Sequence, residues 1–271
     1  MKGAKQMKIS IGGFSFFNMM NEGKMDTFGY LETCKYRYGL STVDLWNGTF
    51  ADTSQSVWKL ADDSHIRKIR EALDEKEMTV INIAVDGAHL WDEEPDKRKL
   101  LYENALAHLR AAHILGAKSV RIDAGDKQSA DPSEEQFEYT VTRYKEYCRI
   151  AEEYGFMIGP ENHMGSSQDP HYLKRVAEAV DHPNFGILLH MDRWAYDAEN
   201  GDRIVVPWVY HTHFDGRTVG SFRAEALVKT LVDAGYDGYW AIEYNAPKDQ
   251  YLEMEWALAA AKRVLRNVYK K

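Results

Sequence analysis

The sequence predicts a (β/α)₈ TIM barrel, an α/β fold formed as a single domain by residues 1–271. Short apolar runs and longer amphipathic stretches alternate about eight times along the chain, which favours parallel strands with helices outside them. Several apolar runs are nearly continuous hydrophobics, as expected for strands that are buried on both faces. No linker rich in Pro, Gly or Ser interrupts the alternation, and 271 residues is an ordinary length for one barrel.

The expected strands follow the apolar runs, and the expected helices lie between them. Strands are expected at residues 7–14, 40–46, 78–85, 118–123, 156–161, 185–191, 207–213 and 239–244. Helices are expected at residues 25–38, 62–76, 96–115, 133–154, 170–181, 196–203, 222–234 and 248–268. The pair Asp169-Pro170 is typical of a helix start, and Gly116 and Gly155 are typical of helix ends. The stretch at 196–203 is short and has the weakest helical pattern.

An open, doubly wound sheet would show the same alternation of strands and helices. Such a sheet usually carries a glycine-rich phosphate-binding turn after its first strand. Here the first strand ends in the bulky sequence Gly12-Gly13-Phe14-Ser15-Phe16-Phe17. The closed barrel is therefore preferred over a nucleotide-binding sheet.

Composition disfavours several kinds of partner. The formal net charge is −8 and no dense Lys/Arg block occurs, so nucleic acid is not expected as a partner. No run approaches the ~20 apolar residues of a membrane helix, and the segment after the basic N-terminus is interpreted as a first strand rather than a signal peptide. The two cysteines, Cys34 and Cys148, form no CxxC pair, so we expect reduced thiols and a cytoplasmic protein.

Four apolar runs in the second half of the chain end in acidic or imidazole side chains. The runs cover residues 156–163, 185–192, 208–215 and 239–245. If they are parallel strands of one barrel, their polar ends meet at the same rim, where barrel active sites lie.

Alternation along each strand groups these side chains by face, because residues two apart point the same way. The resulting groups are Glu161 with His163, His190 with Asp192, His211 with His213, and Glu243 with Asn245. Carboxylates and imidazoles together suit one hard-to-borderline divalent ion, Mn²⁺, Mg²⁺, Co²⁺ or Zn²⁺, of which we expect Mn²⁺. The absence of thiolate ligands argues against a structural zinc site.

The chain resembles the sugar isomerase and epimerase family with a xylose-isomerase-like TIM barrel. The resemblance is carried by Met7-Lys8-Ile9-Ser10, Val43-Asp44-Leu45-Trp46, Glu161-Asn162-His163, His211-Thr212-His213 and Ile242-Glu243. It implies one divalent metal ion held by Glu, Asp, His and Glu from the last four strands. Glu161, His213 and Glu243 match the first, third and fourth of these ligands.

The second ligand departs from the family pattern. Where the family shows Leu-Asp-x-x-His, this chain has Leu189-His190-Met191-Asp192-Arg193. Aligning the apolar run places His190 at the ligand position and Arg193 where the family's His contacts substrate. Sliding the alignment by two residues makes Asp192 the ligand. His190 and Asp192 lie on the same face of the strand, so side-chain alternation cannot separate them. We favour His190 and keep Asp192 as the alternative ligand.

The resemblance also implies proton transfer at a carbon next to a carbonyl, with Glu161 and Glu243 both binding the metal and moving the proton. The expected substrate is a small sugar, keto-sugar or sugar phosphate. Side chains just after strands are expected to contact it, namely Trp46, His89, His163, Asp192 and Arg193. The family forms homo-oligomers or uses a partner subunit, so either assembly is compatible with the chain.

Three other functions are compatible with parts of the same pattern. A lyase could use the same site, because proton removal beside a ketone also permits loss of a β-leaving group; inosose dehydratases and enzymes that cleave oxidised glycosides resemble this family. An apurinic-site endonuclease shares the barrel but needs three zinc ions and more rim ligands than the first half of this chain supplies. A non-catalytic subunit is the fourth reading, and no sequence feature excludes it.

Overall fold

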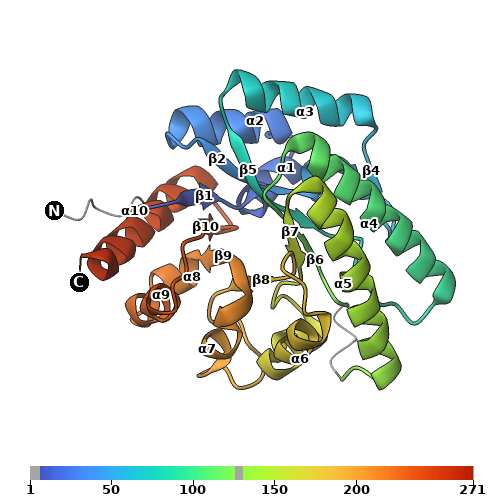
Figure 1. Ribbon diagram of the computed structural model, residues 1–271. Helices are drawn as coiled ribbons and strands as arrows, with labels where there is room; N and C mark the ends of the chain where they lie inside the picture. Colours follow the sequence, from blue (N-terminus) through green and yellow to red (C-terminus); the bar gives the residue numbers. More distant parts are fainter. Residues whose placement is uncertain (1–6, 126–130, 271) are drawn as a thin grey trace.

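Eight parallel strands close into a barrel, as the sequence predicts (Figure 1). The computed structural model describes residues 7–125 and 131–270. Two four-stranded sheets have the orders β1-β10-β9-β8 and β2-β5-β6-β7. Parallel bridges join them at both seams, Gly12 with Asp44 on one side and Glu161 with Leu188 on the other. The barrel strands are β1 (Ile9–Ile11), β2 (Thr42–Trp46), β5 (Thr79–Val85), β6 (Ser119–Ile122), β7 (Met157–Gly159), β8 (Ile187–His190), β9 (Val209–Asp215) and β10 (Trp240–Glu243).

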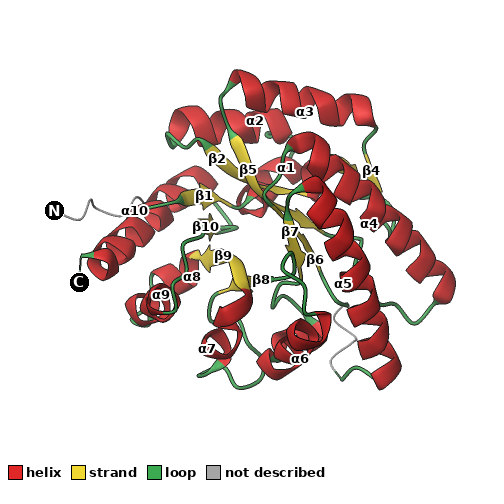
Figure 2. Cartoon of the chain, viewed as in Figure 1, coloured by secondary structure: helices red, strands yellow, loops and turns green. Residues whose placement is uncertain are grey.

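The longer helices lie outside the strands (Figure 2). The helices are α1 (Phe17–Asn21), α2 (Thr27–Glu32), α3 (Asp63–Glu75), α4 (Pro95–Leu115), α5 (Glu134–Tyr154), α6 (Pro170–Val180), α7 (Gly201–Val205), α8 (Gly216–Val219), α9 (Ala224–Asp233) and α10 (Gln250–Tyr269). Short 3₁₀ or π turns occur at η1 (Gly13–Phe16), η2 (Thr33–Arg37), η3 (Asn47–Thr49), η4 (Gly165–Gln168) and η5 (Val206–Trp208).

Most predicted elements lie within a few residues of their predicted positions, but two predicted helices differ, and the short helices α1 and α8 were not predicted. The helix expected at 25–38 is α2 continued by the π turn η2. The helix expected at 196–203 is the five-residue α7, which begins only at Gly201. A hairpin of two-residue strands, β3 (Ala51–Asp52) and β4 (Lys59–Leu60), was not predicted, because strands this short carry no periodic signal.

Two glycines set the path of β7 into the rim. Gly155 ends α5 with a positive φ of 79°, a conformation that glycine adopts without a Cβ clash. At Gly159, a Cβ atom would lie 1.7 Å from the carbonyl oxygen of Gly186. Any side chain there would push β7 away from β8. The close approach of these strands places the residues that follow Gly159 beside the end of β8.

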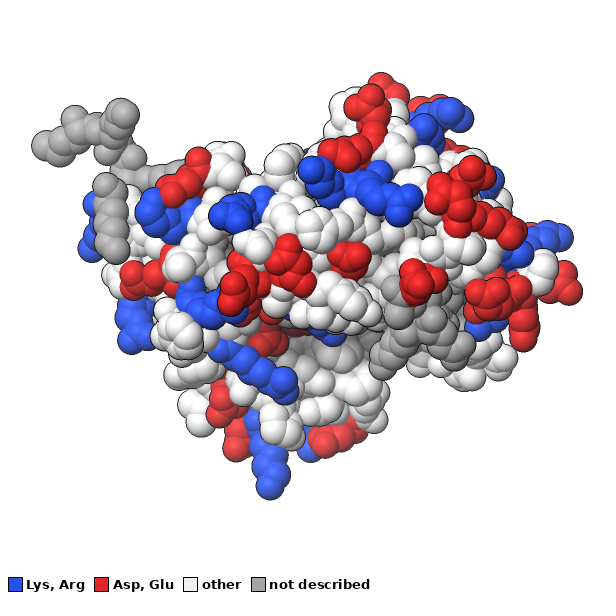
Figure 3. Space-filling view, turned by 90° about the horizontal axis from the view of Figure 1, so that it is seen from below, with Lys and Arg blue, Asp and Glu red and all other residues white. Residues whose placement is uncertain are grey.

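The space between the strands and the outer helices is filled by one apolar cluster that includes Ile11, Leu45, Ile158, Phe214 and Trp240. Cys34 and Cys148 are both buried free thiols. No described helix is long and apolar enough to cross a membrane. On the face drawn in Figure 3, acidic and basic side chains are interspersed, so the described residues there form no large surface of a single sign.

Candidate active site

Acidic and imidazole side chains from four strands gather at one rim of the barrel. Glu161 follows β7 by two residues and bridges to Leu188 of β8. His190 is the last residue of β8 and is the register partner of His213 in β9. Glu243 is the last residue of β10. Because parallel strands end on the same side of a barrel, these four side chains converge there.

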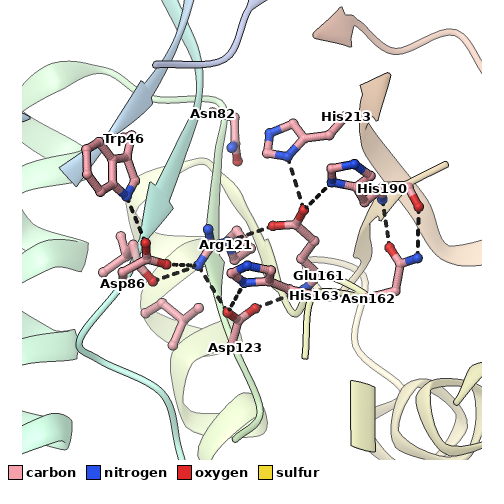
Figure 4. A network of polar contacts seen from close by, with 12 residues as sticks. Trp46, Asn82, Asp86, Arg121, Asp123, Glu161, Asn162, His163, His190 and His213 are labelled. Atoms are coloured by element: carbon pink, nitrogen blue, oxygen red, sulfur yellow. Dashed lines mark hydrogen bonds and ion pairs between the residues drawn. The ribbon is translucent and has the colours of Figure 1, made fainter. Parts of the chain in front are cut away.

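Three direct contacts link these side chains, and Glu243 contacts only His213 among them. Oε1 of Glu161 lies 3.1 Å from Nδ1 of His190 and 3.1 Å from Nδ1 of His213. The Nδ1 atom of His213 also lies 3.3 Å from Oε2 of Glu243. Figure 4 shows the Glu161 carboxylate pointing toward both imidazoles. Glu161, His190 and His213 are buried, while the Glu243 side chain keeps 17% of its surface exposed.

These distances fit a shared metal ion. Ligands about 2.1 Å from one ion lie about 3.0–3.4 Å apart in tetrahedral or octahedral geometry, which matches the three observed separations. Nδ1 of His213 faces two carboxylate oxygens, but one proton can be donated well to only one of them. The donor atoms of Glu161, His190 and His213 lie within 4.8 Å of one another, so these three residues could hold one cation. Among the described residues, Glu243 is in no such group, so its carboxylate would have to move to become a further ligand. Carboxylate oxygens and imidazole nitrogens suit the borderline divalent ions.

Asp44 of β2 contacts the Nε2 side of the His213 ring, opposite the Nδ1 atom that faces Glu161 and Glu243. Its Oδ2 lies 3.0 Å from Nε2 of His213 and 2.8 Å from Nε2 of His211, and its Oδ1 accepts a hydrogen bond from the Asn82 amide at 2.8 Å. Burial raises the pKa of the Asp44 carboxyl, but the two imidazoles outweigh burial and hold that pKa below its usual value. An ionised Asp44 fixes the proton of His213 on Nε2 and leaves Nδ1 for the rim.

Asn162 fixes the end of β8. Its Oδ1 accepts a hydrogen bond from the backbone N–H of His190 at 2.7 Å. Its Nδ2 donates to the carbonyl oxygens of His190 at 2.8 Å and Arg193 at 3.1 Å. One buried amide therefore ties the strand carrying Glu161 to the backbone that carries His190.

Arg121 of β6 contacts three carboxylates, those of Asp86, Asp123 and Glu161. Its Nη1 lies 2.6 Å from Oδ1 of Asp86 and 3.1 Å from Oδ2 of Asp123. Its Nε lies 3.1 Å from Oε2 of Glu161. Burial lowers the pKa of Arg121, but the surrounding carboxylates outweigh burial and raise it well above the usual value. The guanidinium thus stays charged and restrains the second oxygen of Glu161.

His163 belongs to the same network. Its Nδ1 lies 3.0 Å from Oδ2 of Asp123, which leaves Nε2 for a substrate. Burial lowers the pKa of His163, but Asp123 outweighs burial and raises it above the usual value. Asp86, Asp123 and His163 lie close enough to suit a second cation. The guanidinium of Arg121 already contacts both carboxylates, so it supplies positive charge to them.

Two adjacent cavities open at the rim. The first has a volume of about 290 Å³ and is lined by residues including Glu161, His163, Arg193, His213 and Glu243. The second has a volume of about 430 Å³ and is lined by residues including His190, Asp192, Arg217 and Asn245. Phe14, Arg193 and Glu243 line both cavities. A small-molecule substrate can therefore contact Glu243 from either side.

Of the two candidates for the second ligand, His190 is the one that lies beside Glu161 and His213. Asp192 follows the strand in a turn with a positive φ of 63°. Its carboxylate forms an ion pair with Arg223 at 2.8 Å, and its backbone N–H donates to Asp202. Asp192 lines the second cavity but belongs to no cluster with Glu161 or His213.

Of the other expected substrate contacts, His163, Arg193 and Trp46 line the first cavity, and His89 lines neither cavity. The indole of Trp46 also packs against Phe14 and Trp58 and donates from Nε1 to Asp86 at 2.8 Å. Nε2 of His89 lies 3.8 Å from Asp92.

Sequence reasoning missed Arg121 and Asp86 as parts of the site. A signal for Arg121 was present, because Ser119, Arg121 and Asp123 alternate with apolar residues along β6 and so share the inward face. Asp86 follows β5 directly, as the rim residues follow their strands.

Three comparisons place the chain among known proteins. A model of the xylose isomerase-like TIM barrel family matches residues 36–267. A 3-dehydroshikimate dehydratase from Bacillus anthracis is 28% identical over 214 residues, which are 77% of this chain and 71% of that protein. The structure resembles a D-psicose 3-epimerase from Clostridium cellulolyticum H10 solved with D-tagatose, with a TM-score of 0.74 and 17% identity over 96% of this chain and 99% of that one. It also resembles the IOLI protein with a bound zinc atom, with a TM-score of 0.75 and 15% identity over 97% of this chain and 98% of that one.

Proposed function

The chain belongs to the xylose isomerase-like TIM barrel family, and we propose that it is a divalent-metal-dependent isomerase or epimerase of a small sugar, keto-sugar or sugar phosphate. The chain is an enzyme of the xylose isomerase-like superfamily, an epimerase or a dehydratase. The single observation that carries the proposal is the set of donor-atom distances of 3.1–3.3 Å among Glu161, His190, His213 and Glu243.

A divalent ion held by these residues would supply the Lewis acidity that stabilises negative charge on the substrate's carbonyl oxygen. Mn²⁺ is the ion we expect. The zinc atom in the IOLI protein shows that a relative of this fold binds a metal, and it supports a metal in this chain.

Glu243 is the better placed of the two glutamates to accept the proton. Its side chain is the more exposed one and lines both cavities. Glu161 has Oε1 between two imidazoles and Oε2 against Arg121. In an epimerisation, Glu243 keeps the proton that it removes, and a protonated Glu161 donates a different proton to the opposite face of the substrate carbon. Protonation of Glu161 requires Arg121 to release its carboxylate in part.

A dehydratase is the second candidate, and two observations favour it. The relative with 28% identity is a 3-dehydroshikimate dehydratase. The restraint of Glu161 by Arg121 also suits a reaction that needs only one carboxylate base, as elimination does. In that reaction His163 lines the cavity and can donate a proton to the departing hydroxyl group.

Product analysis separates the two candidates. Purified protein would be assayed for bound metals by mass spectrometry, then incubated with D-psicose, D-tagatose and 3-dehydroshikimate. Unchanged substrate mass with a new isomer supports the isomerase or epimerase, and loss of water supports the dehydratase. We expect Glu243→Gln to abolish turnover while the circular dichroism spectrum is retained. Glu138→Gln, on the exposed face of α5, is the matched control. Full activity in Glu243→Gln would refute the mechanism.

A further inference from the structure

Arg193 differs from Arg121 and Arg223 because no carboxylate of the described residues neutralises its charge. Nη1 of Arg121 contacts Asp86 and Asp123, and Arg223 pairs with Asp192 at 2.8 Å. Within residues 7–125 and 131–270, no carboxylate lies within ion-pair distance of the Arg193 guanidinium. Its close polar contact is Nδ1 of His190, 3.2 Å from Nη1. Arg193 is partly buried and lines both cavities, so an unneutralised guanidinium lies beside the metal-type ligands.

A second arginine extends this positive region. Arg217 lines the same 430 Å³ cavity as Arg193. Asp215 accepts a hydrogen bond from the backbone N–H of Arg217 at 2.7 Å. In the part of the chain that the structure describes, the Arg217 guanidinium likewise has no carboxylate within ion-pair distance.

The acidic groups of this second cavity are already engaged. Asp192 pairs with Arg223, and Asp215 caps the first turn of α8. Oε2 of Glu243 faces Nδ1 of His213. The two arginines therefore contribute positive charge that these carboxylates do not directly neutralise.

We propose that Arg193, supported by Arg217, forms a subsite for an anionic group of the substrate, a carboxylate or a phosphate. The proposal rests on the proposed function, because the reactive carbonyl would lie at the Glu161–Glu243 centre while the anion lies toward the second cavity. The planar fork of a guanidinium matches both anions through paired hydrogen bonds. A bound anion would also offset the cost of a partly buried, unpaired cation. The substrate is then an acid, and neutral sugars bind weakly.

Matched ligand pairs test the subsite without relying on turnover. Shikimate would be compared with its methyl ester, and D-glucose 6-phosphate with D-glucose, by isothermal titration calorimetry on metal-free and metal-loaded protein. In the wild-type protein, the anion of at least one pair is expected to bind at least about tenfold more tightly than its neutral partner. The pair that shows the preference identifies a carboxylate or a phosphate as the anion.

Variants then assign the preference to Arg193. Arg193→Gln is expected to weaken binding of the preferred anion roughly 10- to 100-fold more than binding of its neutral partner. Arg193→Lys should retain part of the preference, and Arg217→Gln should reduce it a few-fold. Arg149→Gln, on the exposed face of α5, removes the same charge far from the cavities and should have no effect. Melting curves check that each variant folds.

The outcomes separate this subsite from the proposed function. Equal affinity within both wild-type pairs, or an anion preference that survives Arg193→Gln, overturns the subsite. If metal-dependent turnover is absent but Arg193→Gln still abolishes the preference, the proposed function fails and the subsite stands. If neutral sugars are converted equally well by wild type and Arg193→Gln, the proposed function stands and the subsite fails.

Discussion

Nε2 of His213 lies 3.0 Å from Oδ2 of Asp44, so a carboxylate of β2 orients an imidazole of β9 across the barrel. Asp44 is buried and also contacts His211, so this one carboxylate orients two imidazoles. A partner of this kind controls which ring nitrogen is free to bind a metal.

Asp44→Asn is therefore expected to weaken metal binding about 10- to 100-fold. The amide keeps the size of the side chain but loses the charge that holds the proton of His213 on Nε2. Metal affinity would be measured by competition with a chromogenic chelator. Asp233→Asn, on the surface of α9, is the control for loss of one negative charge. An Asp44→Asn protein with wild-type metal affinity would show that Asp44 does not orient the ligand.

Arg121→Met is expected to destabilise the fold by about 3–5 kcal/mol, because three carboxylates would lose a shared buried cation. Urea denaturation measures the loss. Arg121→Lys keeps the charge but not the several contacts of the guanidinium, and it should lie between the wild type and Arg121→Met. If Arg121→Met unfolds at the wild-type urea concentration, the network contributes no net stability.

Asn162→Ala is expected to cost about 2–4 kcal/mol of folding free energy and to weaken metal binding together. Its loss leaves the backbone N–H of His190 and two carbonyl oxygens without their partner, in a buried position. Asn267→Ala removes an exposed amide that donates to Glu225, and it should change the unfolding free energy by less than about 0.5 kcal/mol. A stable Asn162→Ala protein that binds metal normally would contradict this positioning role.

The rim could be predicted from the sequence because its signal is local. Glu161, His213 and Glu243 each end an apolar run, and parallel strands bring such ends together whatever the intervening helices are. The choice between His190 and Asp192 was not local in this sense. It depends on where β8 ends and on the turn that directs the backbone of Asp192 toward Asp202.

The alternation along β6 marks Arg121 as inward-facing, but the sequence could not show which carboxylates surround it. A buried arginine is tolerated only where several carboxylates surround it, and here they come from separate parts of the chain, Asp86, Asp123 and Glu161. Trp46 shows the same limit. Its position at the end of a strand predicted a contact with substrate, and Trp46 does line the first cavity. The sequence could not show that its ring packs against Phe14 and Trp58 and donates a hydrogen bond to Asp86.

The stability of the protein is expected to fall as the pH rises from about 4 to about 6, through Asp202. Burial raises the pKa of this carboxyl from 3.8 to about 6, against the hydrogen bonds from Trp194 and the backbone of Asp192. In this range the folded state binds more protons than the unfolded state, so higher pH favours unfolding. Above pH 6 the buried carboxylate costs about 2–3 kcal/mol relative to its protonated form.

Asp202→Asn should remove this pH dependence. The amide oxygen can still accept the hydrogen bond from the Trp194 indole, but no charge forms as the pH rises. We expect the variant to match the wild type at pH 4 and to exceed its unfolding free energy by about 2 kcal/mol at pH 7.5, as measured by urea denaturation. Asp197→Asn, at an exposed position nearby, is the control. A variant that is less stable than the wild type at pH 7.5 would mean that the ionised carboxylate of Asp202 is needed to hold the loop after β8.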